Sequence, residues 1–422
     1  MKCRHCGAAL RHTFLDLGFA PPSNAYLTGA DLARPERTYP LKIMVCDKCW
    51  LVQTEDYAAA DELFNADYAY FSSTSSGWLA HAARYARDMI ARFELGRDGF
   101  VIEVACNDGY LLKNFVAASI PCLGIEPTAG TAAAAEQLGI PVRREFFGED
   151  LGRQLAGAGQ QADLIAGNNV YAHVPDINDF TRGLKAALKP GGVITLEFPH
   201  VMRLIEHTQF DTVYHEHFSY LSLYTVAHIF TAAGLKVWDV EQLATHGGSL
   251  RVYGCHAEDS RAATAAVAAL LDEEARHGLQ SLDGYRGFQA RADRLRDDLL
   301  EFLIAQKRAG KSVAAYGAAA KGNTLLNYAG VKADLIPFVC DAALAKQGKF
   351  LPGSHIPILP PSALTERRPD YLLILPWNIA DEIRQRNAGL AAQGTRFVTA
   401  VPALAVSGGS PDGVSRIMVN PC

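Results

Sequence analysis

The stretch FVIEVACNDGYLLKNFVAASIPCLGIEPT, residues 100–128, predicts a strand, a tight loop, a helix and a second strand. The apolar run at 101–105 is typical of a strand that is buried on both faces of a sheet. Small and turn-forming residues follow at 106–109, and residues 110–118 carry apolar side chains at helical spacing. The second strand, at 122–125, ends just before an acidic residue. This strand–helix–strand unit predicts the start of an open α/β sheet.

The loop between this strand and helix differs from a dinucleotide-binding loop, because it has one glycine, Gly109, where that motif has three. A pyrophosphate needs close backbone approach on glycines at a helix N-terminus, and the nearby Glu103, Asn107 and Asp108 disfavour phosphate. They suit a cofactor with a ribose and a cationic amino-acid tail, such as S-adenosylmethionine (SAM). Glu126, at the end of the second strand, can accept hydrogen bonds from both ribose hydroxyls. An ordinary α/β turn with polar residues is the alternative.

Further strands are predicted at 162–166 and 193–198, separated by helical segments, which indicates a parallel, doubly wound sheet. Asn168 and Asn169 follow the first of these strands. We expect them on the rim formed by the carboxyl ends of the strands, where ligands of open α/β sheets bind, and predict that they contact the cofactor. His200 follows the second strand, and we predict that it contacts the substrate.

Two Cys-x-x-Cys pairs lie near the N-terminus: Cys3 with Cys6, and Cys46 with Cys49. Four thiolates brought to one tetrahedron are a typical zinc site, and they leave no open coordination position. We therefore predict a structural Zn²⁺ rather than a catalytic one. Two reduced pairs without a metal are the alternative reading.

Composition narrows the function classes. The 422 residues suggest two or three domains, and 49% hydrophobic content with 20% charged content describes a globular protein with an ample core. The formal charge, 40 − 45 = −5, argues against nucleic acid as the main partner. No stretch is apolar enough to span a bilayer, and the opening MKCRHCG lacks a signal-peptide core. We expect a cytoplasmic protein with no membrane partner and, without heptads, a monomer.

Residues 311–422 repeat the strand–loop–helix layout with different loop chemistry. The loop that follows a predicted strand at 312–316 contains Gly317, Lys321 and Asn323. Small residues with a lysine at the start of a helix favour phosphate, so we predict that these three residues bind the substrate. A tight joint between strand and helix would explain the same pattern.

The densest polar cluster is Tyr214-His215-Glu216-His217. His215 and His217 would share one face of an extended segment and could ligate a metal, but no clear third ligand follows. Acid–base chemistry fits better, because histidine titrates near neutrality and a phenol donates well to a developing oxyanion. The cluster therefore favours removal of a proton beside a carbonyl. A structural hydrogen-bond cluster is the alternative.

Several motifs occur together in one order, and their joint order is highly specific. They are the paired CxxC start, YAYFSS, EVACNDGYLL, GIEPT, NNVYAHVPD, EFPH, YHEHFSYLS, HGGSLRVY, YGAAAKGNTLLNY and CDAALAKQGKFLPGSHIPI. On these motifs the sequence resembles, over essentially its whole length, the nucleotide-sugar C-methyltransferases of deoxysugar biosynthesis, which build tetronitrose-type and mycarose-type branched sugars. One departure is Ala105-Cys106, where glycine-containing pairs are also usual.

The resemblance implies an α/β protein of three parts. They are a zinc-binding domain at 1–60, a Rossmann-like SAM-binding methyltransferase domain at 61–255, and a helical bridge with a second Rossmann-like domain that binds the nucleotide sugar at 256–422. It also implies a 4-keto-deoxysugar on a nucleoside diphosphate as the substrate. Carbon C-3 is favoured over C-5 as the methylated position.

The resemblance further implies roles for individual residues. His217 is expected to be the base that removes the proton alpha to the ketone. Tyr214 and Glu216 belong to the same motif, while His173 and Tyr70 match further active-site positions that stabilise the enolate or orient the sugar.

Two other functions fit parts of the sequence. A nicotinamide-dependent oxidoreductase of nucleotide sugars would use two Rossmann-like units, but neither loop carries the GxGxxG pattern. A non-enzymatic zinc-ribbon adaptor would use the cysteines and would leave the Tyr/His/Glu cluster unexplained.

Overall fold

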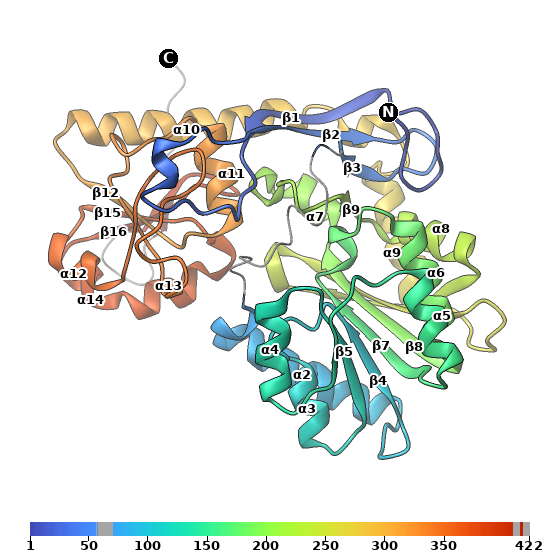
Figure 1. The fold of residues 1–422 in the computed structure, drawn as a ribbon. Helices are drawn as coiled ribbons and strands as arrows, with labels where there is room; N and C mark the ends of the chain where they lie inside the picture. The colour runs from blue at the N-terminus through green and yellow to red at the C-terminus, as the bar shows by residue number, and fades with distance from the viewer. Residues whose placement is uncertain (56, 58–70, 408–413, 417–422) are drawn as a thin grey trace. The chain divides into compact units, whose positions relative to one another are not determined.

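The computed structural model describes residues 1–55, 57, 71–407 and 414–416, and these residues form two compact units (Figure 1). Each unit is assembled from three stretches of chain. The first unit comprises 1–12, 44–202 and 217–284, and the second comprises 13–43, 203–216 and 285–422. The domain boundaries expected from the sequence stay a prediction.

The first unit is built on a seven-stranded sheet in the order β10-β11-β8-β7-β4-β5-β6 (Figure 1). Strands β4 to β8 run parallel, whereas β11 is antiparallel to both β8 and β10. The strand order reverses between β4 and β7, which makes this the point of the rim where a ligand is expected. The strands are β4 Val101–Val104, β5 Cys122–Ile125, β6 Val142–Arg143, β7 Ala162–Asn168, β8 Leu188–Pro199, β10 Leu235–Leu243 and β11 Ser249–His256.

Helices cover both faces of this sheet, because neighbouring residues of a strand point to opposite faces. Val101 and Leu164 pack into the core with α2 and α3, while Ile102 and Ile165 pack into the core with α5, α6 and α8. The fully buried strand predicted at 101–105 is thereby confirmed. The helices are α2 Ser76–Arg92, α3 Leu112–Ala117, α4 Ala129–Gln137, α5 Glu149–Gly157, α6 Ile177–Ala187, α8 Leu223–Ala233 and α9 Ala265–Arg276.

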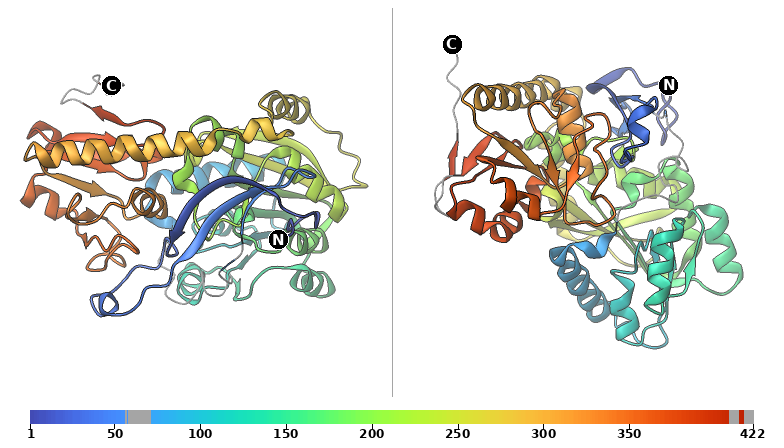
Figure 2. Two further views of the ribbon diagram at one scale, coloured as in Figure 1. Left: turned by 90° about the horizontal axis from the view of Figure 1, so that it is seen from above. Right: turned by 60° about the vertical axis from the view of Figure 1, so that its left-hand side comes forward.

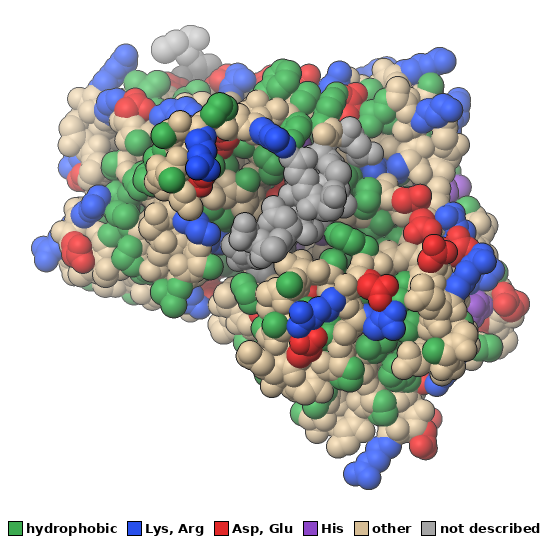
Figure 3. All heavy atoms as spheres, viewed as in Figure 1, with side chains coloured by type: hydrophobic (Ala, Val, Ile, Leu, Met, Phe, Trp, Pro, Cys, Tyr) green, Lys and Arg blue, Asp and Glu red, His purple; other side chains and the backbone are tan. Residues whose placement is uncertain are grey.

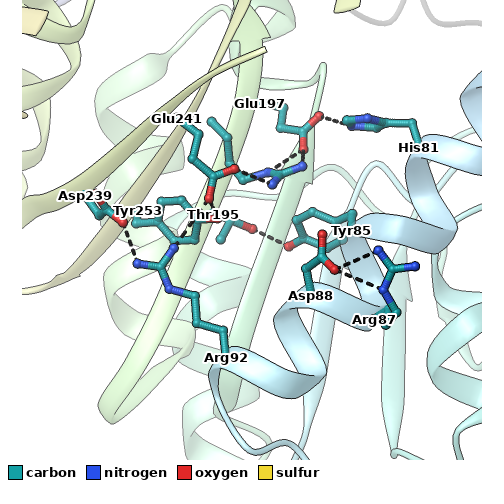
Figure 4. Close-up of polar contacts among 11 residues, drawn as sticks. His81, Tyr85, Arg87, Asp88, Arg92, Thr195, Glu197, Asp239, Glu241 and Tyr253 are labelled. Atoms are coloured by element: carbon teal, nitrogen blue, oxygen red, sulfur yellow. Dashed lines mark hydrogen bonds and ion pairs between the residues drawn. The ribbon is translucent and has the colours of Figure 1, made fainter. Parts of the chain in front are cut away.

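A buried charged network attaches α2 to the sheet (Figure 4). His81 on α2 contacts Glu197 on β8 at 2.8 Å, and the second oxygen of that carboxylate accepts from Arg251 on β11 at 2.7 Å. Further along the helix, Tyr85 hydrogen-bonds Thr195. The opposed charges lower the pKa of Glu197 although its burial acts to raise it. This pairing fixes the start of α2, which lies next to the loop that follows β4.

The second unit contains another seven-stranded sheet, in the order β14-β13-β12-β15-β16-β17-β18. Strands β12 to β16 are parallel, and the order reverses between β12 and β15. The strands are β12 Val313–Tyr316, β13 Val339–Cys340, β14 Ile358–Leu359, β15 Tyr371–Ile374, β16 Arg396–Thr399, β17 Ala405–Ser407 and β18 Val414–Arg416. The helices are α10 Phe288–Arg308, α11 Ala320–Tyr328, α12 Ser362–Arg367, α13 Ala380–Arg386 and α14 Ala388–Ala392.

The N-terminal strands β1 (His12–Ala20) and β2 (Tyr39–Val45) lie mostly in the second unit. There Phe14 stacks on Phe288 of the long helix α10, which the two views of Figure 2 show in gold, with ring centroids 4.5 Å apart. In the first unit, β3 (Val52–Thr54) pairs antiparallel with β9 (Ser219–Tyr220). The short helix α7 (Val201–Glu206) contains the passage from the first unit to the second.

The strand predicted at 193–198 is longer in the structure, where β8 begins at Leu188. Residues 189–192 form an irregularity in the ladder between Leu188, which pairs with Ala162, and Val193, which pairs with Leu164. Gly191, at φ 77°, provides the left-handed backbone that this irregularity needs.

On the faces seen in Figure 3, positive and negative side chains are interspersed, in keeping with a formal charge of −5. Among the described residues, no helix has the length and apolar character needed to cross a bilayer.

Candidate active site

The loop between β4 and α3 has an unusual backbone. Ala105, Asn107 and Gly109 all adopt positive φ, at 59°, 51° and 78°. Glycine accepts this conformation without a steric penalty, asparagine tolerates it and alanine does not. The loop therefore has a left-handed backbone at three positions, although only one of them is glycine. A Cβ on Gly109 would lie 2.5 Å from Ile140, so packing also requires glycine there.

Glu126 is 5% exposed and holds this loop from the end of β5. One carboxylate oxygen accepts from the backbone N–H of Asn107 at 3.0 Å, and the other accepts from the N–H of Thr128 at 2.9 Å. Each oxygen retains capacity for a further donor, since an ionised carboxylate offers about four acceptor positions. The predicted ribose acceptor is thus fixed in place by the backbone.

Two serines just before α2 bind the side chains of this loop. The Ser72 N–H donates to Asn107 Oδ1 at 2.9 Å, while the N–H of Ser73 donates to Asp108 Oδ2 at 3.0 Å and its hydroxyl donates to the same oxygen. These serines of the short helix η2 (Ser72–Thr74) were not predicted as site residues, although the serine run was a visible signal. The predicted Tyr70 lies outside the described residues.

Buried polar atoms without a partner mark the rim between β4 and β7. Glu103 is fully buried. The Tyr110 hydroxyl and the Leu112 N–H act to lower its pKa, but neither carboxylate oxygen has a hydrogen bond of good geometry among the described residues. The same holds for Oδ1 of Asp108 and for both amide atoms of Asn168. Burial raises the pKa of Glu103 well above its ordinary value, and the carboxylates of Asp108 and Glu126 raise it further. Such groups call for a bound cation with hydrogen-bond donors.

SAM fits this arrangement. Its ammonium group would relieve the buried Glu103 carboxylate, and its ribose hydroxyls would reach the remaining acceptor positions of Glu126. Asn168 would supply an amide to the same ligand. Asn169, also predicted to contact the cofactor, adopts φ 57° and donates its N–H to the carbonyl of Glu197 at 2.8 Å, so its backbone shapes the exit from β7.

The structure brings His173 and His217 together in the first unit. Their rings meet edge to face with centroids 4.5 Å apart, and His217 also packs against Tyr220 at 5.9 Å. His173 ends the short helix η3 (Tyr171–His173), shortly after β7, and the N–H of Phe218 donates to the carbonyl of Ala172 at 2.8 Å. His173 thus follows the rim at which β4 and β7 end, and His217 joins it there from a later part of the chain.

His200 has a different environment. It is 1% exposed, and its Nε2 donates to the buried carboxylate of Glu274 at 2.7 Å. Glu274 also accepts the N–H groups of Leu223 and Tyr224 at the start of α8, at 2.6 and 2.9 Å. Contact of His200 with a substrate stays a prediction, and the structure shows a buried imidazole that bridges β8 and α9.

Tyr214, His215 and Glu216 lie in the second unit, and the chain enters the first unit at His217. His215 donates from Nε2 to the carbonyl of Pro40 at 3.2 Å, and its burial lowers its pKa. Glu216 is 1% exposed and accepts from the side-chain amide of Asn24 at 3.1 Å. That the members of this cluster act in one site stays a prediction.

The predicted substrate loop lies at the switch point of the second sheet, between the carboxyl ends of β12 and β15. Gly317 adopts φ 91°, and a Cβ there would lie 2.5 Å from Pro376. Lys321, in the first turn of α11, donates to Asn378 Oδ1 at 3.1 Å and lies 4.7 Å from the Trp377 ring. Asn323 is buried, and its amide donates to the carbonyl of Ser23 at 2.6 Å, so this amide anchors the N-terminal segment.

Asp211 is an unpredicted member of this group. It is fully buried and accepts from the indole N–H of Trp377 at 2.7 Å, and its other oxygen has no partner among the described residues. Burial raises its pKa to about 6. Burial also lowers the pKa of Lys321 to about 8, although Asp211 opposes that shift. An anion bound nearby would raise this pKa again and so favour the charged form of Lys321.

The four predicted cysteines converge in the first unit. Their sulfur atoms all lie within 4.8 Å of one another, and Cys3–Cys49 and Cys6–Cys46 are 3.5 and 3.6 Å apart. A tetrahedral zinc with Zn–S bonds of ~2.3 Å needs sulfurs ~3.8 Å apart. The side chain of Gln53 donates to Cys3 Sγ at 3.2 Å, as expected around a thiolate. The donor set fits a structural Zn²⁺.

The residues between Cys3 and Cys6 contact the start of α6 and its surroundings. Arg4 donates to the carbonyls of Pro175 and Thr54 at 2.7 and 3.1 Å, and its guanidinium lies 5.4 Å from the Phe218 ring. His5 donates to the Asn178 side chain on α6 at 2.8 Å. The metal centre therefore supports the backbone next to His217.

Comparison with known proteins agrees with this geometry. Family models match at 3–64 (zinc binding domain), 78–240 (methyltransferase domain) and 244–402 (C-methyltransferase C-terminal domain). The C-methyltransferase NovU of Streptomyces niveus is 34% identical over 401 residues, which cover 95% of each protein. A ubiquinone biosynthesis O-methyltransferase of Methylobacterium nodulans is 27% identical over 122 residues, 26% of this chain and 47% of that protein.

Among solved structures, a magnesium protoporphyrin IX methyltransferase of Synechocystis with bound SAH has a TM-score of 0.33 and 12% identity, covering 42% of this chain and 82% of that one. The family matches favour a methyltransferase over the nicotinamide-dependent oxidoreductase and the zinc-ribbon adaptor. They confirm the predicted fold class and the predicted cofactors, SAM and zinc. The chain belongs to the family of SAM-dependent C-methyltransferases that carry an N-terminal zinc-binding domain.

Proposed function

We propose that this protein transfers a methyl group from SAM to a sugar carbon alpha to the ketone of a nucleoside-diphosphate 4-keto-deoxysugar, with C-3 favoured. The observation that carries the proposal is the edge contact of His173 and His217, because His173 follows β7, which pairs with the strand β4 that contains Glu103. The pair provides a base near the expected methyl donor. The family relationship to a C-methyltransferase supports carbon as the acceptor.

His217 takes the proton from the sugar carbon as the C–H bond breaks, and the electron pair moves toward the ketone oxygen. Donors from His173 and Tyr214, and from Tyr70, stabilise the resulting enolate. When bound, SAM supplies an electrophilic methyl on a sulfonium, so that the new C–C bond forms as the S–CH₃ bond breaks. Little further activation is needed, and alignment in a water-poor site supplies much of the rate.

The nucleotide is held by the second unit in this proposal, within residues 256–422. Lys321 and Gly317 lie at the switch point of the second sheet, where α/β folds bind ligands. A diphosphate would restore the full charge on Lys321, whose pKa burial has lowered. Glu216, buried on the same unit, is the carboxylate of the catalytic motif. A cytoplasmic location and a monomeric state stay predictions.

The test is incubation with SAM and a thymidine-diphosphate 4-keto-6-deoxyhexose in deuterated water. We expect deuterium to enter one sugar carbon and a methyl group to appear on it, both seen by mass spectrometry and NMR. His217→Asn should abolish both while SAM still binds, whereas His228→Asn, at an exposed position on α8, should leave them unchanged. Retained turnover in His217→Asn would remove His217 as the base, and methylation at oxygen would overturn the proposed reaction.

A further inference from the structure

The segment between β1 and β2 contributes one side chain to the catalytic motif, and all of the contacts involved lie within the second unit. The amide nitrogen of Asn24 donates to Glu216 Oε1 at 3.1 Å. The Tyr26 hydroxyl lies 3.5 Å from Asn24 Oδ1, but its single proton goes to the carbonyl of Ala318 at 2.5 Å. The contact with Glu216 therefore fixes which end of the amide faces the carboxylate, because only the NH₂ group can donate to it.

This segment is anchored on the nucleotide-binding side of the same unit. The side chain of Asn323, 1% exposed on α11, donates to the carbonyl of Ser23 at 2.6 Å. Tyr26 donates to the carbonyl of Ala318 at 2.5 Å, in the loop that follows β12. Residues 23–26 are therefore held by the strand–helix junction that contains Lys321, so Asn24 has a fixed position relative to that junction.

The Glu216 carboxylate needs such a donor. It is 1% exposed, and burial raises its pKa above the ordinary value, while hydrogen bonds from the Asn24 side chain and backbone and from its own backbone act to lower it. The neighbouring titratable group in this unit is His215, which donates to Pro40 and has a lowered pKa. The Asn24 amide is thus one of the hydrogen-bond donors that favour the ionised form of Glu216.

We propose that Asn24 is a positioning residue: its amide keeps the Glu216 carboxylate ionised and oriented, and it does so from a segment anchored on the substrate-binding loop after β12. The inference rests on the proposed role of Glu216 in the methyl-transfer motif. Asn24 itself is not assigned to contact the sugar or the methyl donor. Asn24 acts through its hydrogen bond to the Glu216 carboxylate, so its loss should change how activity depends on pH.

The test compares Asn24→Ala and Asn24→Asp with the wild type in two measurements across pH 4.5 to 8. The first is the turnover of the thymidine-diphosphate 4-keto-6-deoxyhexose, and the second is the thermal unfolding midpoint without any ligand. Loss of the donor should raise the Glu216 pKa, so the acidic limb of kcat should move up by about one pH unit, and kcat near that limb should fall about tenfold. Asn24→Asp, which adds a like charge, should shift it further.

The stability measurement works without substrate. A carboxyl group whose folded pKa is raised loses stability as pH rises from its unfolded value, near 4.3, through the folded value. In Asn24→Ala this loss should extend to higher pH. In the Glu216→Gln background the pH-dependent part of the Asn24→Ala effect should vanish, because the double mutant cycle removes the titrating partner. Gln393→Ala changes an exposed residue at the end of α14, away from Asn24 in the sequence, so it should match the wild type in both measurements.

The outcomes separate the two proposals. If Asn24→Ala keeps the wild-type pH limb while Glu216→Gln is inactive, Asn24 is not a positioning residue and the proposed function stands. If the pH-dependent stability effect persists in Glu216→Gln, Asn24 acts through another group and the inference fails. If Glu216→Gln turns over normally while the stability cycle shows coupling, the catalytic role of Glu216 fails and the hydrogen bond remains purely structural.

Discussion

At the scale of single residues, Glu126 combines two roles. Its carboxylate accepts the backbone N–H groups of Asn107 and Thr128, and it lies at the end of β5, where a ribose is expected. The same oxygens shape the loop and are predicted to bind the ribose of the cofactor. Replacing Glu126 by glutamine keeps the size of the side chain and removes its charge, so it tests the contribution of the charge without changing the packing.

Glu126→Gln should weaken binding of SAH about tenfold, since hydrogen bonds to a charged group are worth ~1.5–3 kcal/mol and one acceptor becomes a donor. Isothermal titration calorimetry measures the change directly. Glu136→Gln is the matched control, because that exposed glutamate on α4 pairs with Arg144 and should bind the ligand normally. Unchanged affinity in Glu126→Gln would place the ribose elsewhere.

Residue chemistry that depends on local spacing was predictable from the sequence, as the four cysteines show. Residues whose role depends on distant partners were not. Asp211 looks like an ordinary loop acid until Trp377 and the buried environment are in place. Asn24 likewise gains its role only because the chain returns 192 residues later to place Glu216 beside it.

At the scale of elements, the β4–α3 loop adopts the left-handed backbone conformation at positions that are not glycine. Ala105 and Asn107 adopt the left-handed region without a glycine's freedom. Left-handed geometry costs roughly 1–2 kcal/mol per residue for ordinary side chains, so surrounding contacts must maintain it. The hydrogen bonds from Ser72 to Asn107 and from Asn107 to Glu126 are such contacts.

A pair of glycine substitutions measures how crowded this loop is. Gly109 and Gly139 share φ 78°, but a Cβ at Gly109 would meet Ile140 at 2.5 Å, while a Cβ at Gly139 would meet nothing within 4 Å. We expect Gly139→Ala to cost ~1 kcal/mol and Gly109→Ala to cost ~1–3 kcal/mol more, from strain plus overpacking. Urea unfolding gives both values. Equal costs would show that the loop relaxes freely around the added methyl.

Strand and helix existence followed from periodicity, but strand ends did not. Strand β4 was predictable from its apolar run, and the structure buries every residue from Val101 to Val104. For β8 the sequence predicts a start at residue 193, and the pairing of Leu188 with Ala162 shows that the ladder begins earlier.

At the scale of the whole molecule, the two units are interleaved along the chain. The cysteine pairs contribute to the first unit, while residues 13–43 between them belong to the second. In the first unit Cys3, Cys46 and Cys49 join a large hydrophobic core, together with Leu51 and residues of the helices α6 and α8. Sequence spacing predicted the metal site but gave no sign of this interleaving, because it depends on contacts between distant segments.

Removal of zinc should therefore affect methyl transfer as well as stability. Chelation, or Cys46→Ser, should lower the thermal midpoint by several degrees and reduce turnover, because Arg4 of the first knuckle holds the backbone at Thr54 and Pro175 near His217. Elemental analysis should find one zinc per chain. Cys340→Ser, in the second sheet, should keep the metal, whereas full activity of a metal-free protein would contradict the supporting role.

The buried polar atoms of Glu103 and Asn168 that have no hydrogen-bond partner among the described residues have a consequence for sustained turnover. Our prediction is that they bind the amino-acid end of the methyl donor, which the thioether product keeps unchanged. The product differs from the donor only at sulfur, by one methyl group and one positive charge, so we expect weak discrimination between the two. We therefore expect SAH to inhibit the protein as it accumulates, so that continued turnover requires another enzyme that degrades SAH.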